Sequence, residues 1–329
     1  MAAPRDRRGL LGQRRAARRP VHRNRVRVLL PSHRPGRRRA RLDGHLPDTA
    51  VRRDLGVADS RGTSDPYHGV GRRADPCGCR AQPARSQAPG ESLKRLLQFP
   101  NLLNARDLGG YPTVDGAQTS WRSLVRADDL AQLTAEGVRA LADYGVQTVV
   151  DLRWPEEAAL HPSPVPAALP QVRYERISLL THTEDEWRLR SRDVAKELWK
   201  CVVLEHVRVE LHHVLSAIAA APAGPLLFHC VAGKDRTGLI AALLLALADA
   251  QPQAIARDYA MSSANLRDAY LKRYAEADPQ RILEALHCPE DGAYNMLQFL
   301  ADAGGVRAYL AQIGLKEDEI ERLRRRLRG

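Results

Sequence analysis

The first ninety residues of this 329-residue chain contain no lysine and no glutamate. They hold 22 arginines against seven aspartates, a net charge of +15, whereas the whole chain carries +12. The basic character therefore belongs to one end of the chain. A segment rich in Arg, Pro and Gly without apolar periodicity buries too little surface to offset its ordering entropy. We predict a disordered extension over residues 1–91, whose arginine-only composition fits codon usage upstream of the native start better than a nucleic-acid-binding arm.

Long apolar runs are also missing. After the extension the longest run is Leu239–Ala248, which is far below the roughly 20 residues that a helix needs to cross a bilayer. Near the start, the letters VRVLLP are too few for the apolar core of about 7–15 residues in a secretory signal. These absences predict a soluble, cytoplasmic protein.

Cysteine is scarce, with five residues in the chain. Cys77 and Cys79 have metal-like spacing but lack a second pair, so no metal or cofactor site is predicted. Cys201 and Cys288 are interpreted as core thiols, although a disulfide from either to Cys230 would protect the latter from oxidation. This usage fits a reducing compartment.

From about Ser92 onward, strand patterns alternate with helix patterns. Residues 134–145 predict a helix with Thr134 as N-cap and Gly145 at the C-cap. Strands are predicted at 146–154, 172–179 and 225–229, with a proline-rich connection over 155–170. Further helices are predicted over 193–220, from about 235, over 252–277, 279–288, 291–302 and 303–313, and in the C-terminal KEDEIERLRRRL.

This alternation predicts an α/β domain over residues 92–329 with a helical C-terminal part. Its mostly parallel central sheet is flanked by helices on both faces. Ligands of such sheets bind at the carboxyl ends of the strands, and Cys230 follows the strand at 225–229 at that end.

The stretch PLLFHCVAGKDRTGLIAALLLALADA, Pro225–Ala250, joins that strand to an apolar helix through Cys-x5-Arg. The amides of residues 231–236 and the helix N-terminus behind them form a concave anion site. Gly233 lets the backbone bend close to its guest. Arg236 can donate two parallel hydrogen bonds to phosphate oxygens.

The same positive field favours the thiolate of Cys230, and the Thr237 hydroxyl is placed to hydrogen-bond it. A thiolate at the bottom of a phosphate cradle predicts nucleophilic attack on phosphorus. A buried strand cysteine followed by an ordinary capped helix is the alternative. It does not explain why His229, Gly233, Arg236 and Thr237 all occur at these offsets.

The string HCVAGKDRTG resembles the signature of the cysteine-dependent tyrosine phosphatases, and within them the atypical bacterial branch of tyrosine/phosphoinositide dual-type enzymes. NARDLGGY, SLVRADDLAQLT and VVDLRWPEE are similar to further motifs of that branch, and YLAQIGLKEDEIERLRRRL to its C-terminal helix pair. The resemblance spans roughly Leu96 to Leu327. The stretch between ERISLL and the next helix departs from the family in length and composition, which bears on any lid over the site.

The resemblance implies hydrolysis of phosphate monoesters, above all protein phosphotyrosine, with Cys230 as the nucleophile. A carboxylic acid protonates the leaving oxygen, and Asp235 is favoured over Asp151. His229 orients the cysteine. No metal is implied, because the loop supplies the positive charge. The implied phosphate-binding residues are Val231, Ala232, Gly233, Lys234 and Thr237, together with catalytic Arg236.

Several alternatives stay open. Lys234 is either a solvated loop cation or a contact to a second phosphate, which would admit phosphoinositides as substrates. Asp107, Asp128 and Asp129 are interpreted as structural, with Asp107 anchoring Arg122 or Arg126. A phosphate-binding pseudoenzyme is a further alternative, which the complete set of chemical residues argues against. No pattern indicates the oligomeric state.

Overall fold

The computed structural model describes residues 94–180 and 204–329, so the predicted extension over 1–91 lies outside the described residues. The described residues form one five-stranded sheet in the order β1-β2-β5-β3-β4. Only the β1–β2 pair is antiparallel, and the other three pairs are parallel. The predicted mostly parallel central sheet is confirmed. The strands are β1 (Arg106–Asp107), β2 (Leu124–Ala127), β3 (Thr148–Asp151), β4 (Arg173–Arg176) and β5 (Leu226–His229).

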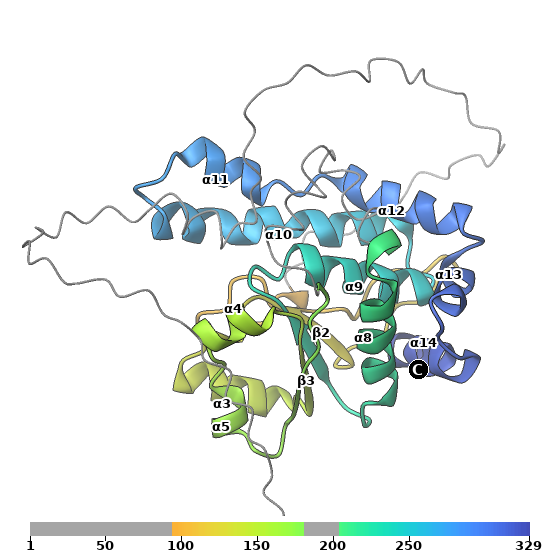
Figure 1. Cartoon of the computed structure of the whole chain (residues 1–329), viewed down its shortest axis with the longest axis horizontal. Helices are drawn as coiled ribbons and strands as arrows, with labels where there is room; N and C mark the ends of the chain where they lie inside the picture. The colour runs from red at the N-terminus through yellow and green to blue at the C-terminus, as the bar shows by residue number, and fades with distance from the viewer. Residues whose placement is uncertain (1–93, 181–203) are drawn as a thin grey trace, which may run out of the picture. The chain divides into compact units, whose positions relative to one another are not determined.

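Helices cover both faces of the sheet, as expected from its buried strands. Val149 and Leu227 lie side by side in register and pack in one apolar cluster with Val138 of α3 (Ala135–Tyr144) and Val165 of α5 (Val165–Ala168). The neighbouring residues along each strand point the other way, toward α8 (Arg208–Ala220) and α9 (Asp235–Leu247). Figure 1 shows the sheet between α3 and α5 on one side and α8 and α14 on the other.

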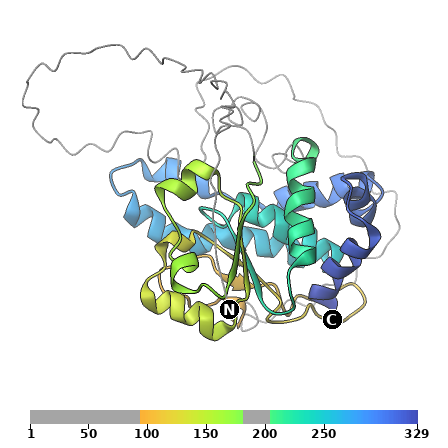
Figure 2. The same ribbon diagram turned by 60° about the horizontal axis from the view of Figure 1, so that its bottom comes forward.

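From Gly238 onward helix α9 is apolar on every side, and nearly all of these residues are buried. It contacts the sheet through β2 and β5, and it contacts α10, α13 and α14 on its other sides. Figure 2 shows the same order of layers after rotation, with the strands between the yellow-green helices and green α8. The remaining elements are η1 (Leu130–Gln132), α4 (Pro155–Leu160), α10 (Pro252–Arg273), α11 (Pro279–Leu286), α12 (Glu290–Asp302), α13 (Val306–Gln312) and α14 (Glu317–Arg328).

The helix predicted over 134–145 is confirmed at both ends. The Thr134 side chain accepts a hydrogen bond from the N–H of Gly137, and Gly145 ends α3 in the left-handed conformation at φ 85°. Among the described helices none combines the length and the apolar character needed to cross a bilayer.

Two predictions about helices are wrong. The single helix over 193–220 is interrupted at Val207, whose φ of −113° and ψ of 35° are not helical, so α8 begins at Arg208; residues 193–203 lie outside the described residues. The connection predicted at 155–170 contains α4 and α5, each with a proline in its first turn. Proline is tolerated there because the first helical N–H has no partner within the helix.

Candidate active site

The loop that follows β5 lies at the centre of the sheet edge. Ala127, His229 and Asp151 are in register at the carboxyl ends of β2, β5 and β3, so the segments after β2 and β3 flank the loop on both sides. Cys230 is the first residue after β5 and is 2% exposed. Helix α9 begins five residues later, at Asp235.

Each carbonyl from Val231 to Lys234 accepts a hydrogen bond. The donors are the Asp129 N–H to Val231 (3.0 Å), the Asn104 amide to Ala232 and Gly233 (3.1 Å each), the Arg126 guanidinium to Gly233 (2.6 Å) and the Gly238 N–H to Lys234 (2.8 Å). In a trans peptide the carbonyl and the following N–H point in opposite directions. The N–H groups of the loop therefore face away from these donors. Within residues 94–180 and 204–329 the N–H groups of 231–234 donate no hydrogen bond, so they are available to an anion.

Gly233 is required by the neighbouring strand. Its φ is +62°, and a Cβ at this position would lie 2.5 Å from the carbonyl oxygen of Ala127 and 2.7 Å from the nitrogen of Asp128. The sequence predicts a glycine that lets the backbone approach a guest. The structure gives a different reason, because the close approach is to the end of β2.

Replacing Gly233 with alanine is therefore expected to lower the free energy of unfolding by about 3 kcal/mol, with a left-handed penalty of about 1–2 kcal/mol and the remainder from the clash. Gly116→Ala is the matched control, since Gly116 has φ +84° but no atom within 4 Å of its added Cβ. Urea unfolding of both variants measures the difference. Equal losses would mean that the end of β2 yields to the new methyl group.

Two buried arginines and one aspartate brace the loop from behind. Asp258 of α10 accepts hydrogen bonds from Arg106 (2.7 Å) and Arg126 (2.5 Å), and all three side chains are at most 3% exposed. Arg106 in turn donates to the side-chain oxygen of Asn104 (2.7 Å). Arg126 and Asn104, which hold the loop carbonyls, are thus themselves fixed by α10. Burial alone would raise the pKa of Asp258, but the two guanidinium groups hold it well below its ordinary value.

The three aspartates interpreted as structural all bind main-chain N–H groups. Asp107 accepts hydrogen bonds from the N–H groups of Gly109 and Arg122, at 2.8 Å each. Asp128 accepts hydrogen bonds from the N–H groups of Leu103 and Asn104, and both of its Oδ atoms lie within 3.1 Å of the Leu103 nitrogen. Asp129 accepts a hydrogen bond from the N–H of Ala131, at 3.0 Å. The Asp107 carboxylate thus anchors Arg122 through the backbone N–H of Arg122. The predicted alternative of Arg126 as its partner is wrong, because that guanidinium is bound by Asp258. Burial raises the pKa of Asp128 to about 6.

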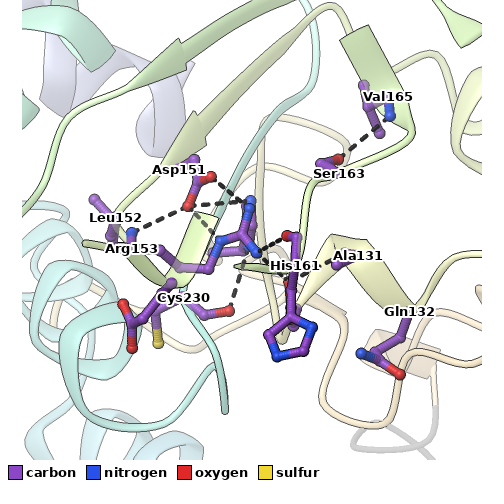
Figure 3. A network of polar contacts seen from close by, with 12 residues as sticks. Ala131, Gln132, Asp151, Leu152, Arg153, His161, Ser163, Val165 and Cys230 are labelled. Carbon is purple, nitrogen blue, oxygen red and sulfur yellow. Dashed lines mark hydrogen bonds and ion pairs between the residues drawn. The ribbon is translucent and has the colours of Figure 1, made fainter. Parts of the chain in front are cut away.

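Both carboxylate oxygens of Asp151, the second candidate for the general acid, accept hydrogen bonds. Its carboxylate accepts two hydrogen bonds from the guanidinium of Arg153 (2.9 and 2.8 Å) and one from the hydroxyl of Tyr174 (2.8 Å). Figure 3 shows Arg153 between Asp151 and the backbone of His161. Burial favours the neutral acid, but the hydrogen bonds and the charge of Arg153 outweigh it and lower the pKa of Asp151. This carboxylate is held in its charged form and is 1% exposed.

Asp235, the favoured candidate, is more accessible. Its side chain is 38% exposed and lies 3.2 Å from the ammonium of Lys234. The hydroxyl of Tyr259 lies 3.4 Å from its other oxygen. A carboxyl group at the start of α9 that reaches solvent can meet the leaving group of a bound ester.

A model of a family described as the tyrosine phosphatase family matches residues 97–329, which is most of the chain. The chain belongs to the tyrosine phosphatase family. The expected enzyme class is thereby confirmed.

Two relatives of this phosphatase are themselves named as phosphatases. A tyrosine-protein phosphatase of Nostoc commune is 33% identical over 223 residues, which cover 62% of this chain and 74% of the relative. The triple specificity protein phosphatase PtpB of Mycobacterium tuberculosis is 24% identical over 278 residues, 70% of this chain and 99% of the relative. The crystal structure of P. aeruginosa TpbA is 21% identical and covers 50% of this chain and 86% of its own, but its TM-score of 0.24 is too low to bear on the fold.

Lys234 of the phosphatase is not the solvated cation that one sequence interpretation predicts. The residue is 7% exposed, and its ammonium donates to the carbonyl of Ala285 in α11 (2.5 Å) as well as facing Asp235. Burial disfavours its charge, but the Asp235 carboxylate outweighs this and raises the pKa of Lys234. Lys234 thus ties the loop to α11.

His229 and Thr237 are both fully buried. A ring nitrogen of His229 lies 3.3 Å from the carbonyl oxygen of Cys230, so the ring contacts the cysteine through its backbone. Burial lowers the pKa of His229 and Asp151 only partly offsets this, so the ring is neutral. The predicted bond from Thr237 to the cysteine is not formed, since the Thr237 hydroxyl has no hydrogen-bond partner within the described residues.

One residue that contacts the loop of the phosphatase was missed from the sequence. Glu157 of α4 forms a bidentate ion pair with Arg236, at 2.6 and 2.8 Å. Its place in the WPEE sequence signals only a helix start, because glutamate at the third helical position is an ordinary capping residue. Nothing local shows that the carboxylate reaches a loop 79 residues away.

Proposed function

We propose that this phosphatase hydrolyses phosphotyrosine in proteins through a phosphocysteine intermediate on Cys230. The supporting observation is that hydrogen bonds hold the carbonyls of Val231–Lys234, which leaves the loop N–H groups without a partner in the described residues. With Arg236 they supply positive charge for the equatorial oxygens of a transferring phosphoryl group.

In the first step the thiolate of Cys230 attacks phosphorus, an S–P bond forms and the bond from phosphorus to the tyrosine oxygen breaks. The leaving oxygen takes a proton from the carboxyl group of Asp235. In the second step water attacks the phosphocysteine, its proton passes to the Asp235 carboxylate, and the S–P bond breaks. Inorganic phosphate leaves and the thiolate is restored.

Asp235 is proposed as the acid rather than Asp151. Asp235 is partly exposed beside the loop. Asp151 is buried, and Arg153 and Tyr174 occupy both of its oxygens. A carboxylate so engaged would have to break three hydrogen bonds before it could carry a proton.

Phosphotyrosine is proposed over phosphoinositide as the substrate. The Nostoc commune relative is named a tyrosine-protein phosphatase. The phosphoinositide alternative depends on Lys234 as the ligand of a second phosphate. That ammonium already binds Ala285 and Asp235, so it would first have to leave both.

The proposed chemistry also needs Cys230 as a thiol. Neither Cys230 nor Cys288 is in a disulfide. We therefore propose a reducing, cytoplasmic setting, which cell fractionation of the native organism would test. Recovery of the protein from the culture medium would contradict it.

Turnover of a phosphotyrosyl peptide, a phosphoseryl peptide and phosphoinositide vesicles, all in excess EDTA, tests the proposal. We expect phosphate release from the phosphotyrosyl peptide to be fastest and unaffected by the chelator. A requirement for an added divalent metal would contradict the mechanism. Faster phosphate release from the vesicles would contradict phosphotyrosine as the preferred substrate.

Asp235→Asn is expected to lower kcat by about 10²-fold or more with phenyl phosphate, whose leaving oxygen needs a proton. The loss should be much smaller with p-nitrophenyl phosphate, whose leaving group departs without one. Asp151→Asn is the comparison variant, for which we expect lower stability but no dependence on the leaving group. The reverse pattern would assign the acid to Asp151.

A further inference from the structure

The carboxyl group of Asp235 contacts side chains on two sides. Its Oδ2 lies 3.2 Å from the ammonium of Lys234, and its Oδ1 accepts a hydrogen bond from the hydroxyl of Tyr259 at 3.4 Å. We propose that Tyr259 of α10 is the positioning residue of Asp235, whose carboxyl group it holds toward α10 and off the guanidinium of Arg236. The inference rests on the proposed function, in which Asp235 is the general acid and Arg236 binds the phosphate.

Asp235 needs such a restraint because it stands at the anion site itself. It is the first residue of α9, where the helix N-terminus favours any negative charge, and Arg236 follows it directly. Burial opposes the charge of Arg236, but Glu157, Cys230 and Asp235 outweigh this and raise the pKa of its guanidinium. A carboxylate that turned onto Arg236 would compete with the substrate phosphate for the same donors, and it would carry its proton away from the leaving oxygen.

Gly238 makes room for the ring of Tyr259. A Cβ at position 238 would lie 3.1 and 3.3 Å from two ring carbons of Tyr259. Gly238 is three residues after Asp235 on α9, and residues with this spacing lie on the same helix face. A ring that covers Gly238 therefore brings its hydroxyl to the carboxyl group of Asp235. The last glycine of HCVAGKDRTG thus leaves the space that Tyr259 occupies.

Tyr259 is itself fixed in place. It is 5% exposed and packs in an apolar cluster with Ala293 of α12. The preceding residue of α10, Asp258, is bound by two buried arginines, which fixes this turn of the helix. Burial, followed by the charge of Asp235, raises the pKa of Tyr259 well above its ordinary value. The phenol therefore keeps its proton and can donate a hydrogen bond to the carboxylate.

Lys234 does not provide the same restraint. Its ammonium is tied to the carbonyl of Ala285 at 2.5 Å, and an ammonium is a point charge with three rotatable donors. It attracts the carboxylate without fixing its orientation. The phenol has a single O–H on a ring that is held by its packing, so it defines where Oδ1 lies. Because 3.4 Å is long for an O–H···O hydrogen bond, we expect effects of moderate size.

Tyr259→Phe keeps the ring over Gly238 and removes only the hydroxyl. In single turnovers at saturating enzyme, we expect the rate constant of phenol release from phenyl phosphate to fall about tenfold. With p-nitrophenyl phosphate the loss should be less than about twofold, because that leaving group departs without a proton. An equal loss with both esters would mean that Tyr259 acts through packing alone and would overturn the proposal.

Tyr294→Phe is the matched control. It removes a phenol from the same apolar cluster, at a position that lies near Arg257 and Glu290. We expect it to leave both rate constants unchanged, and circular dichroism of the two variants checks that each has the wild-type fold. A loss in Tyr294→Phe with the same dependence on the leaving group would contradict a specific role of Tyr259.

Inhibition by inorganic phosphate tests the second part of the proposal. Without the hydroxyl of Tyr259 the carboxylate of Asp235 can turn onto Arg236, so the competitive inhibition constant of phosphate should rise about threefold in Tyr259→Phe. An unchanged inhibition constant would mean that Asp235 stays off Arg236 without help, which is contrary to the proposal.

A double-mutant cycle separates positioning from a structural effect. Asp235→Asn removes both the proton donor and the competing charge. Introduced into that background, Tyr259→Phe should change neither the single-turnover rate constants nor the inhibition constant by more than about twofold. A further loss as large as that in the wild-type background would show that Tyr259 does not act through Asp235.

Failure of the proposed function has a different signature. If Asp235→Asn loses equally with both esters, Asp235 is not the general acid, and the role of Tyr259 fails with it. If Asp235→Asn shows the dependence on the leaving group and Tyr259→Phe behaves like Tyr294→Phe, the general acid stands and the role of Tyr259 alone is wrong.

Discussion

Replacing Cys230 with serine is expected to lower phosphotyrosyl peptide hydrolysis by at least about 10⁵-fold, as removal of a nucleophile does in other covalent enzymes. The serine hydroxyl is not ionised at neutral pH, and within residues 94–180 and 204–329 no side-chain base forms a hydrogen bond with the sulfur that it would replace. The neighbouring imidazole of His229 contacts the carbonyl of residue 230 and lies 3.6 Å from Asp151. The measurement is single-turnover phosphate release at high protein concentration.

The serine variant should remain folded and should still bind its substrate. Cys230 is buried, and serine fits the same space, so we expect a nearly unchanged melting temperature. The loop N–H groups and Arg236 are untouched, so titration calorimetry should detect binding of a phosphotyrosyl peptide. Cys288→Ser is the control, since Cys288 is also buried and should keep most of the activity. Loss of peptide binding in Cys230→Ser would mean that the cradle depends on the sulfur atom.

Asp258→Asn is expected to have the largest effect on stability, about 3–5 kcal/mol in the free energy of unfolding. The change leaves the guanidinium groups of Arg106 and Arg126 buried without a compensating charge. For a domain of this size each kcal/mol corresponds to roughly 2–4 °C in Tm. Asp268→Asn, at an exposed position of the same helix, should change Tm little. Calorimetry that finds equal Tm values for the two variants would contradict the bracing role of Asp258.

The effect of Asp258 should depend on pH with a definite sign. Because its pKa in the folded protein lies well below the ordinary value of about 3.9, the folded state binds fewer protons than the unfolded state. The stabilisation is therefore fully present above about pH 4 and is lost as the pH falls from there toward the folded pKa. The stability difference between wild type and Asp258→Asn should shrink below about pH 4. If the stability difference between the two proteins stays constant down to pH 2, the stabilisation comes from the shape of the Asp258 side chain and not from its charge.

Features with a local cause could be predicted from the sequence. The ends of α3 follow from Thr134 and Gly145, because a capping hydroxyl and a left-handed glycine act on their own helix. The position of Cys230 at a strand end follows in the same way, since the apolar run before it and the Gly-Lys-Asp-Arg turn after it are contiguous. Such signals need no knowledge of the rest of the fold.

Features that depend on distant partners could not be predicted. Strand β2 was not predicted, because Arg126 within it is a charged residue in a fully buried position. Its partner Asp258 is 132 residues away, and nothing near Arg126 indicates that pairing. The same holds for Glu157 and for the ammonium of Lys234, whose partner carbonyl at Ala285 is 51 residues away. The role of a charged side chain can be predicted only when the group that it binds is known.

The braced carbonyls of the phosphate loop have a consequence for how the enzyme becomes active. Asn104 holds a carbonyl 129 residues away, and Arg126 holds the same one across 107 residues. The loop thus acquires its shape only when β1, β2, β5 and α10 have come together, and a peptide of the loop and α9 alone would lack it. Catalytic competence should appear with the last cooperative step of folding, so partly folded chains in the cell would be unable to dephosphorylate anything before they are complete.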